Sequence, residues 1–178
     1  IKLQNLYCNN NQLTSLDISK NIQLTYLTCS NNQLNNLDVS KNIKLQNLYC
    51  NNNQLTSLDI NKNIKLAALL CSNNQLNNLD VSKNTKLTYL ACSQNQLDNL
   101  SISKNIKLEQ LYCNNNQLTS LDIRPLLDLW ELACCYQAEG FILYLTKEQK
   151  YIFTDADYCD AILKENGSIC EIEWLDIY

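Results

Sequence analysis

The sequence predicts a parallel β-solenoid, in which each short stretch of chain forms one coil of a stacked core. The first observation is a pattern, LxxLxCxxNxLxxL, that begins at Leu3 and recurs every 21 residues as far as a degenerate copy at Leu129. Strict repeats of this length are typical of solenoids. The second is the turn composition: 2 glycines and 1 proline leave asparagine to form the turns, because asparagine tolerates left-handed backbone angles.

Each coil is expected to contain one short strand on the core side of the repeat. A leucine, one variable residue and a cysteine alternate there, and alternation with period two is typical of a β-strand. Identical strands at a fixed spacing stack in parallel and in register, about 4.8 Å apart. The inward cysteines are expected to form a ladder of reduced thiols that pack as small hydrophobic groups, comprising Cys8, Cys29, Cys50, Cys71, Cys92, Cys113 and Cys134.

An asparagine follows each of the first six ladder cysteines after three residues. We expect its amide to turn inward where the strand ends and to satisfy backbone groups of its own coil and the next one. This structural ladder comprises Asn11, Asn32, Asn53, Asn74, Asn95 and Asn116.

A column of aspartates, Asp17, Asp38, Asp59, Asp80 and Asp122, recurs later in the repeat. It could form a calcium array, or each carboxylate could accept hydrogen bonds within its own turn. The turn interpretation is favoured, because calcium needs several oxygen ligands per ion.

The repeat changes in its seventh copy. Arg124-Pro125-Leu126 replaces the Ser-Lys-Asn that closes earlier coils, and Gln137 replaces the ladder asparagine. We therefore expect a solenoid over residues 1–137 and a C-terminal capping segment over residues 138–178. Within the cap, residues 140–145 predict a last strand or coil, and Asn166-Gly167 predicts a β-hairpin near residues 161–174. The chain opens in mid-repeat, and solenoids need capping units at both ends, so we expect residues upstream.

The fuller pattern LxxLxCxxNxLxxLDVSxN resembles the bacterial leucine-rich repeats of the 21-residue, cysteine-bearing type, as found in internalin J-like and Bacteroidetes surface proteins. The likeness covers residues 1–137 and the motif recurs six times. The resemblance implies a right-handed solenoid, placed by convention in the α/β class, with short parallel strands on the concave face and little regular helix on the convex side. It also implies a bacterial, adhesion-type protein at the cell surface or outside the cell; a cytoplasmic location stays open.

Composition gives little support for catalysis or cofactor binding. The chain has no histidine, the commonest general base and metal ligand, and it lacks the motifs of hydrolases, phosphate-binding loops and metalloproteases. The 10 cysteines show no CxxC spacing, so no metal site is expected. We therefore predict a protein that is not an enzyme and has no cofactor.

Charge and hydropathy argue against two classes of partner. There is no basic run to indicate nucleic-acid binding, and no apolar run approaches the roughly 20 residues of a membrane span. Residues 1–124 carry 11 Lys or Arg against 7 Asp or Glu, whereas residues 125–178 carry 3 against 11. The acidic end is expected to discourage end-to-end stacking, which favours a monomer.

The candidate site is the face of the sheet that points away from the core. Its positions vary along the chain, and they are rich in Tyr, Asn, Ser and Thr with little charge before Glu109. Antibody paratopes use a similar mixture, although aromatic residues can also serve only to stabilise strands. We predict that this face binds a protein or a glycan-bearing ligand, with contacts at Tyr7, Tyr26, Tyr49, Leu70, Tyr89, Tyr112 and Trp130. The alternatives are an intracellular interaction scaffold, a sensing arm of a larger protein, and a self-assembling structural protein.

Overall fold

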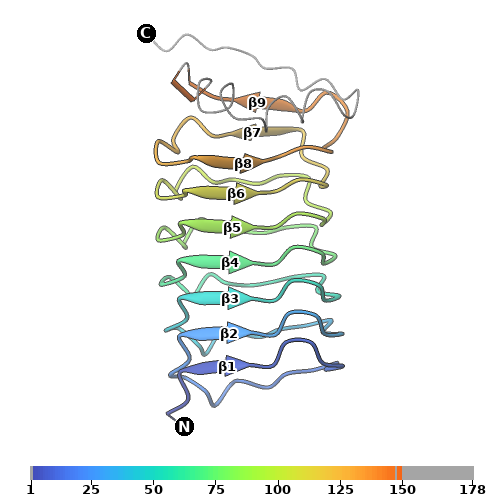
Figure 1. Ribbon diagram of the computed structural model, residues 1–178, viewed down its shortest axis with the longest axis vertical. Helices are drawn as coiled ribbons and strands as arrows, with labels where there is room; N and C mark the ends of the chain where they lie inside the picture. The colour runs from blue at the N-terminus through green and yellow to red at the C-terminus, as the bar shows by residue number, and fades with distance from the viewer. Residues whose placement is uncertain (1, 147, 150–178) are drawn as a thin grey trace.

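The computed structural model describes residues 2–146 and 148–149 as a curved stack of coils. Every strand is three residues long. They are β1 (Asn5–Tyr7), β2 (Tyr26–Thr28), β3 (Asn47–Tyr49), β4 (Ala68–Leu70), β5 (Tyr89–Ala91), β6 (Gln110–Tyr112), β7 (Ser120–Asp122), β8 (Glu131–Ala133) and β9 (Ile142–Tyr144). Strands β1 to β6 and then β8 lie one above the other, and β7 and β9 lie beyond β8 (Figure 1). Glu148 and Gln149 are the only described residues in helical conformation.

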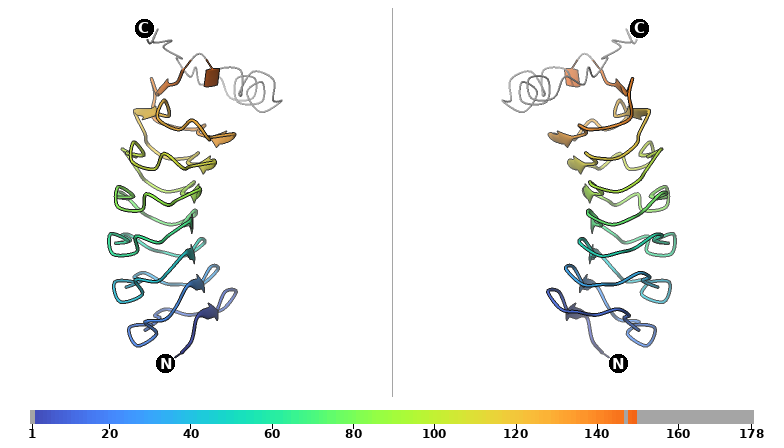
Figure 2. Two further views of the ribbon diagram at one scale, coloured as in Figure 1. Left: turned by 90° about the vertical axis from the view of Figure 1, so that its left-hand side faces the viewer. Right: turned by 90° about the vertical axis from the view of Figure 1, so that its right-hand side faces the viewer.

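One parallel sheet contains β1 to β6 and then β8, in that order. The strands pair in register, so that Leu6 lies beside Leu27 and Leu27 beside Leu48. The two side views show that this sheet forms the concave side of the stack (Figure 2). The predicted solenoid of short parallel strands with almost no helix is therefore confirmed.

The core is a continuous column of leucines and cysteines. Leu27, Cys29, Leu48 and Cys50 are fully buried, and their counterparts in the next coils repeat this arrangement. The return segments on the other side of each coil add further apolar side chains, such as Leu34 and Val39 in the second coil. Because each coil packs only on its neighbours, the core extends along the stack.

The turn that follows each strand depends on a left-handed residue just before the ladder asparagine. Residues at this position have φ between 54° and 57°, comprising Asn10, Asn31, Asn52, Asn73, Gln94, Asn115 and Tyr136. Asparagine is enriched among residues that adopt this conformation, because its short polar side chain can bond the local backbone. The expected role of asparagine in turning the chain is thus seen at five of these seven positions.

The predicted asparagine ladder lies where each strand ends, and it joins neighbouring coils. In the fourth coil, the Leu55 backbone N–H donates to Asn74 Oδ1 over 3.0 Å. Asn74 Nδ2 donates to the carbonyl oxygens of Cys50, at 3.1 Å, and Cys71, at 3.0 Å. One side chain therefore satisfies buried backbone groups of two coils.

A second asparagine ladder closes each coil in the turn that leads into the next strand. This ladder was not predicted from the sequence. Asn42, Asn63, Asn84 and Asn105 are fully buried. Asn63 Nδ2 donates to the carbonyl oxygens of Val39 and Asn42, at 3.1 Å and 2.9 Å. Its Oδ1 has no hydrogen-bond partner within the described residues, and the same holds in the other three coils. The sequence signal for this ladder was the asparagine that follows the lysine of each coil-closing segment, Ser-Lys-Asn or, before Asn63, Asn-Lys-Asn.

At the end of the stack, Gln137 occupies the position of the first ladder asparagine, Leu126 interrupts the second ladder, and Gln149 makes the second ladder's type of hydrogen bond one coil later. Gln137 Nε2 donates to the Cys113 carbonyl at 2.8 Å, and Gln137 Oε1 accepts from the Leu118 N–H at 3.1 Å. Gln149 Nε2 donates to the carbonyls of Ile123 and Leu126, at 2.7 Å and 3.0 Å. The longer glutamine side chain reaches the same kind of backbone groups.

Strand β9 is the last strand that the structure describes, and it pairs in parallel with β7. Leu121 lies beside Leu143, so this coil is one residue longer than the 21-residue repeat. Phe141, Leu143 and Leu145 are buried at this end of the core. The boundary expected at residues 137–138 stays a prediction, and the hairpin expected near residues 161–174 lies outside the described residues.

Candidate functional site

The concave face presents the outward side chains of the seven-stranded sheet. Tyr7 is 65% exposed, Tyr49, Leu70 and Tyr112 are half-buried, and Trp130 lies exposed just before β8. Tyr26 and Tyr89 are also half-buried and occupy the first position of their strands. All seven predicted contact residues therefore have surface available on or beside this sheet.

The five tyrosines among these residues form two clusters rather than one continuous stripe. In the first, which we call the N-terminal tyrosine cluster, the ring centroid of Tyr26 lies 5.2 Å from those of both Tyr7 and Tyr49. In the second, the C-terminal tyrosine cluster, the centroids of Tyr89 and Tyr112 are 5.5 Å apart. These separations are typical of favourable aromatic pairs.

The clusters arise because large and small residues alternate between strands. Tyr26 and Tyr89 each share their strand with a small outward residue, Thr28 or Ala91. The tyrosine of the following strand, Tyr49 or Tyr112, lies beside that small residue. Thr28 and Ala91 are consequently only 8% exposed. The same arrangement occurs twice, three coils apart.

Hydrogen bonds fix the polar side chains that follow the strands. Ser30 Oγ donates to Asn51 Oδ1 over 2.6 Å, and Ser93 Oγ donates to Asn114 Oδ1 over the same distance. The first bond links the segments that follow β2 and β3, which carry the Tyr26–Tyr49 pair. The second links the segments that follow β5 and β6, which carry the Tyr89–Tyr112 pair. Each tyrosine pair is thus accompanied by an ordered amide, which provides hydrogen-bonding groups next to aromatic surface.

Charged side chains occur on the concave face only near its C-terminal end. Gln110 Nε2 donates to Glu131 Oε2, which links β6 to β8. Burial raises the pKa of the Tyr89 hydroxyl, and the negative charge of Glu131 raises it further. Burial is also the main reason that the pKa of Tyr26 is raised. These phenols stay neutral at physiological pH and can act as hydrogen-bond donors or acceptors.

The cysteine ladder is placed for packing rather than for chemistry. Burial raises the pKa of the Cys29 and Cys92 thiols to about 12, and it raises the pKa of Cys50, Cys71 and Cys113 well above the usual value. Reactive cysteines have lowered pKa values, since the thiolate is the nucleophile. Across residues 2–146 and 148–149, no group of three or more Cys, Asp or Glu side chains could hold a metal ion.

The aspartate column makes the hydrogen bonds that the turn interpretation predicts. Asp17 Oδ1 accepts from the Ser19 N–H at 2.9 Å, and Asp80 accepts in the same way from Ser82. Hydrogen bonds to Ser19 are the main reason that the pKa of Asp17 is lowered. The carboxylates at these positions therefore stabilise turns.

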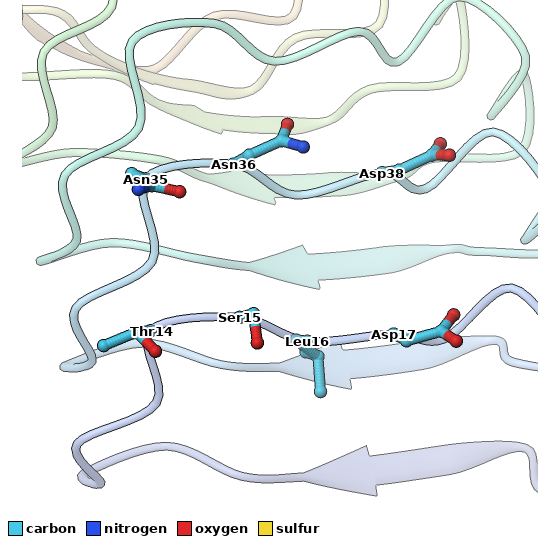
Figure 3. Close-up of a pocket in the computed structure, with 7 residues that line it drawn as sticks. All are labelled: Thr14, Ser15, Leu16, Asp17, Asn35, Asn36 and Asp38. Atoms are coloured by element: carbon cyan, nitrogen blue, oxygen red, sulfur yellow. The ribbon is translucent and has the colours of Figure 1, made fainter.

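A polar hollow of about 360 Å³ lies on the return segments of the first two coils, away from the tyrosines. Figure 3 shows the carboxylates of Asp17 and Asp38 pointing in the same direction at one end of it, with Thr14 and Asn35 at the other. Its other lining residues are Ser15, Leu16 and Asn36. The hollow shares no residue with the predicted contacts.

Comparison with known proteins gives structural relatives but no sequence family. No family model matches the chain, and no curated protein matches it either. The functional domain of InlJ from Listeria monocytogenes, which includes a cysteine ladder, is 28% identical, with a TM-score of 0.54. The match covers 80% of this chain and 43% of that one.

Two further Listeria monocytogenes structures have the same fold. An internalin (inlF) is 22% identical over 99% of this chain and 48% of its own, with a TM-score of 0.69. Internalin C2 is 24% identical over 81% of this chain and 71% of its own, with the same TM-score. The chain thus spans less than half the length of the InlJ and inlF structures.

The fold and these relatives define the protein as a leucine-rich-repeat solenoid. The stacked cysteines make it similar, more particularly, to the cysteine-ladder form represented by InlJ, so the resemblance seen in the repeat is confirmed. Within the described part of the chain, no helix is long and apolar enough to cross a bilayer.

Proposed function

We propose that this protein is a non-catalytic recognition module, which binds a protein or a glycoconjugate on its concave face. We further propose that it acts at a bacterial surface or as a secreted, adhesion-type protein. The observation that carries the binding proposal is the pair of tyrosine clusters on a nearly uncharged, curved sheet. The surface location rests on the likeness to InlJ alone.

The concave face combines two properties that favour recognition. Its tyrosines offer rigid aromatic surface that loses little conformational entropy on binding. The hydroxyl–amide pairs Ser30–Asn51 and Ser93–Asn114 hold polar groups beside the rings. A ligand that lies along the solenoid axis could contact both clusters, because the same arrangement recurs three coils later.

A capture experiment with matched variants tests this proposal. The parent, Tyr26→Ser/Tyr49→Ser and Tyr89→Ser/Tyr112→Ser are immobilised and exposed to glycan arrays and to cell-surface extracts. The control is Ser15→Ala/Asn36→Ala, which changes the hollow on the other face. We expect a ligand that the parent and the control retain and that at least one tyrosine variant loses while still folded.

Other outcomes would move or remove the site. A ligand retained equally by all four proteins would place recognition away from the tyrosines. The absence of any ligand for the parent would favour a structural role, which a concentration-dependent increase in mass would support.

A further inference from the structure

A separate column of exposed apolar side chains runs along one lateral edge of the solenoid. It comes from the turns that lead into the strands, on the left-hand edge of Figure 1. Ile22, Ile43, Ile64 and Ile106 are 50% to 56% exposed, and Leu127 is 77% exposed. In one coil, Thr85 occupies the equivalent position. We call these residues the isoleucine edge.

Lysines flank the isoleucine edge on both sides. In each of the three coils that carry Ile43, Ile64 and Ile106, one lysine lies two residues before the isoleucine and another directly after it. All ten lysines between residues 2 and 124 belong to these two columns and are exposed, comprising Lys2, Lys20, Lys41, Lys44, Lys62, Lys65, Lys83, Lys86, Lys104 and Lys107.

These lysines are not neutralised by direct ion pairs. Among residues 2–146, the ion pair is Arg124–Asp122, at 2.8 Å, and it involves none of these lysines. The first four aspartates of the column each lie three residues before a lysine, and each carboxylate accepts a hydrogen bond from a backbone N–H group of its turn. Residues 2–107 contain ten lysines and five aspartates, namely Asp17, Asp38, Asp59, Asp80 and Asp98. The edge therefore has a net positive charge.

We propose that the isoleucine edge docks on the surface of a lipid bilayer that contains anionic headgroups. A bilayer surface supplies negative charge for both lysine columns and an apolar phase for the isoleucines between them. The lysines can keep their ammonium groups at headgroup level while their methylene chains lie against apolar surface. Docking of this kind requires no membrane-spanning element.

Two other occupants fit the edge less well. A second copy packed edge to edge would bring lysine columns against lysine columns, because lysines flank the isoleucines on both sides. A soluble polyanion would pair with the lysines but would leave the half-exposed isoleucines without an apolar partner. Of these three occupants, the bilayer surface alone matches both chemical features.

The fold makes the edge long and leaves the candidate binding face open. At about 4.8 Å per strand, the five intervals from β1 to β6 extend for about 24 Å. The turns stack along the side of the sheet rather than on its concave face (Figure 1). A protein docked through this edge would therefore hold the tyrosine clusters to one side, accessible to a ligand.

Vesicle co-sedimentation tests the proposal with defined lipids. We expect the protein to bind vesicles of phosphatidylcholine mixed with phosphatidylglycerol and not vesicles of phosphatidylcholine alone. Each lysine near an anionic surface is worth about a fivefold increase in partitioning, so Lys65→Gln/Lys86→Gln/Lys107→Gln should lose roughly a hundredfold. Ile43→Thr/Ile64→Thr should lose about tenfold, from reduced apolar burial.

The variants are chosen so that a folding defect does not imitate the result. Threonine already occupies the isoleucine position at Thr85, so the fold accepts it there. Gln54→Ser/Gln75→Ser changes two exposed residues of the opposite turns and serves as the control. Circular dichroism and urea unfolding check each variant.

Three results would overturn the proposal. The first is no binding of the parent to anionic vesicles. The second is equal binding by the isoleucine variant, which would mean that the charge of the lysines accounts for binding by itself. The third is equally tight binding of the parent to soluble poly-glutamate, which would assign the lysines to a polyanion. The tyrosine variants should bind vesicles as the parent does, which separates this proposal from recognition on the concave face.

Discussion

Replacing the buried amide of Asn74 with alanine should destabilise the protein strongly. The substitution removes the acceptor of the Leu55 N–H and the donor to the Cys50 and Cys71 carbonyls. The side chain is only 8% exposed, so water cannot easily replace these bonds. An unsatisfied buried group costs about 1 to 3 kcal/mol. With one N–H group and one or two carbonyls affected, we expect Asn74→Ala to lower the free energy of unfolding by about 3 to 5 kcal/mol.

The assay compares Asn74→Ala with Asn77→Ala, which changes an exposed asparagine of the same coil. Urea unfolding gives the free-energy difference, and hydrogen exchange of the Leu55 amide reports on the local effect. We expect the control to lie within about 0.5 kcal/mol of the parent. If the two variants differ by less than about 1 kcal/mol, the ladder amide is not a main source of stability and the reasoning fails.

Three further predictions concern single positions. Asn63→Ala should lower the free energy of unfolding, measured with urea, by less than Asn74→Ala does. It leaves two carbonyls without a donor, but it also removes an oxygen that has no partner. An equal or larger loss would contradict this. Gln94→Asn should stabilise the protein by roughly 0.5 kcal/mol, since φ is 54° there, whereas Gln96→Asn, at an exposed position in the same coil, should not. The free energy of unfolding should fall as pH rises above about 9, because the pKa values of Cys29 and Cys92 are raised to about 12 by burial. The unfolded chain then loses thiol protons that the folded chain retains, and Cys92→Ala should show a shallower decrease; an unchanged slope would refute the assignment.

The repeat spacing was sufficient to predict the coil, the strand and its register. A period of 21 residues with leucine and cysteine in alternation leaves one way to bury both, so the parallel sheet β1 to β6 and β8 follows from the pattern. The left-handed turn residues could be anticipated by residue type, although not by position. The second asparagine ladder was missed because Asn42 and its counterparts lie in a polar Ser-Lys-Asn segment, which looks exposed in sequence.

The candidate site was predicted residue by residue but not in its organisation. Sequence columns identify which side chains point outward, yet they do not show diagonal contacts between columns. The pairing of Tyr26 with Tyr49 depends on the small Thr28 beside them and on the register of β2 and β3. Whether these tyrosines contact a ligand stays a prediction.

The sequence by itself determined the architecture, because a strict repeat of apolar residues specifies the same local structure in every coil and stacking is the only way to bury it. The tertiary structure decided which surface side chains touch their neighbours in space. Ten lysines, scattered along the chain without any basic run, become two columns beside the isoleucine edge once the coils stack. Tyrosines from alternate positions become two clusters. The physical reason is that stacking brings residues 21 apart to within about 5 Å, a proximity that sequence order hides.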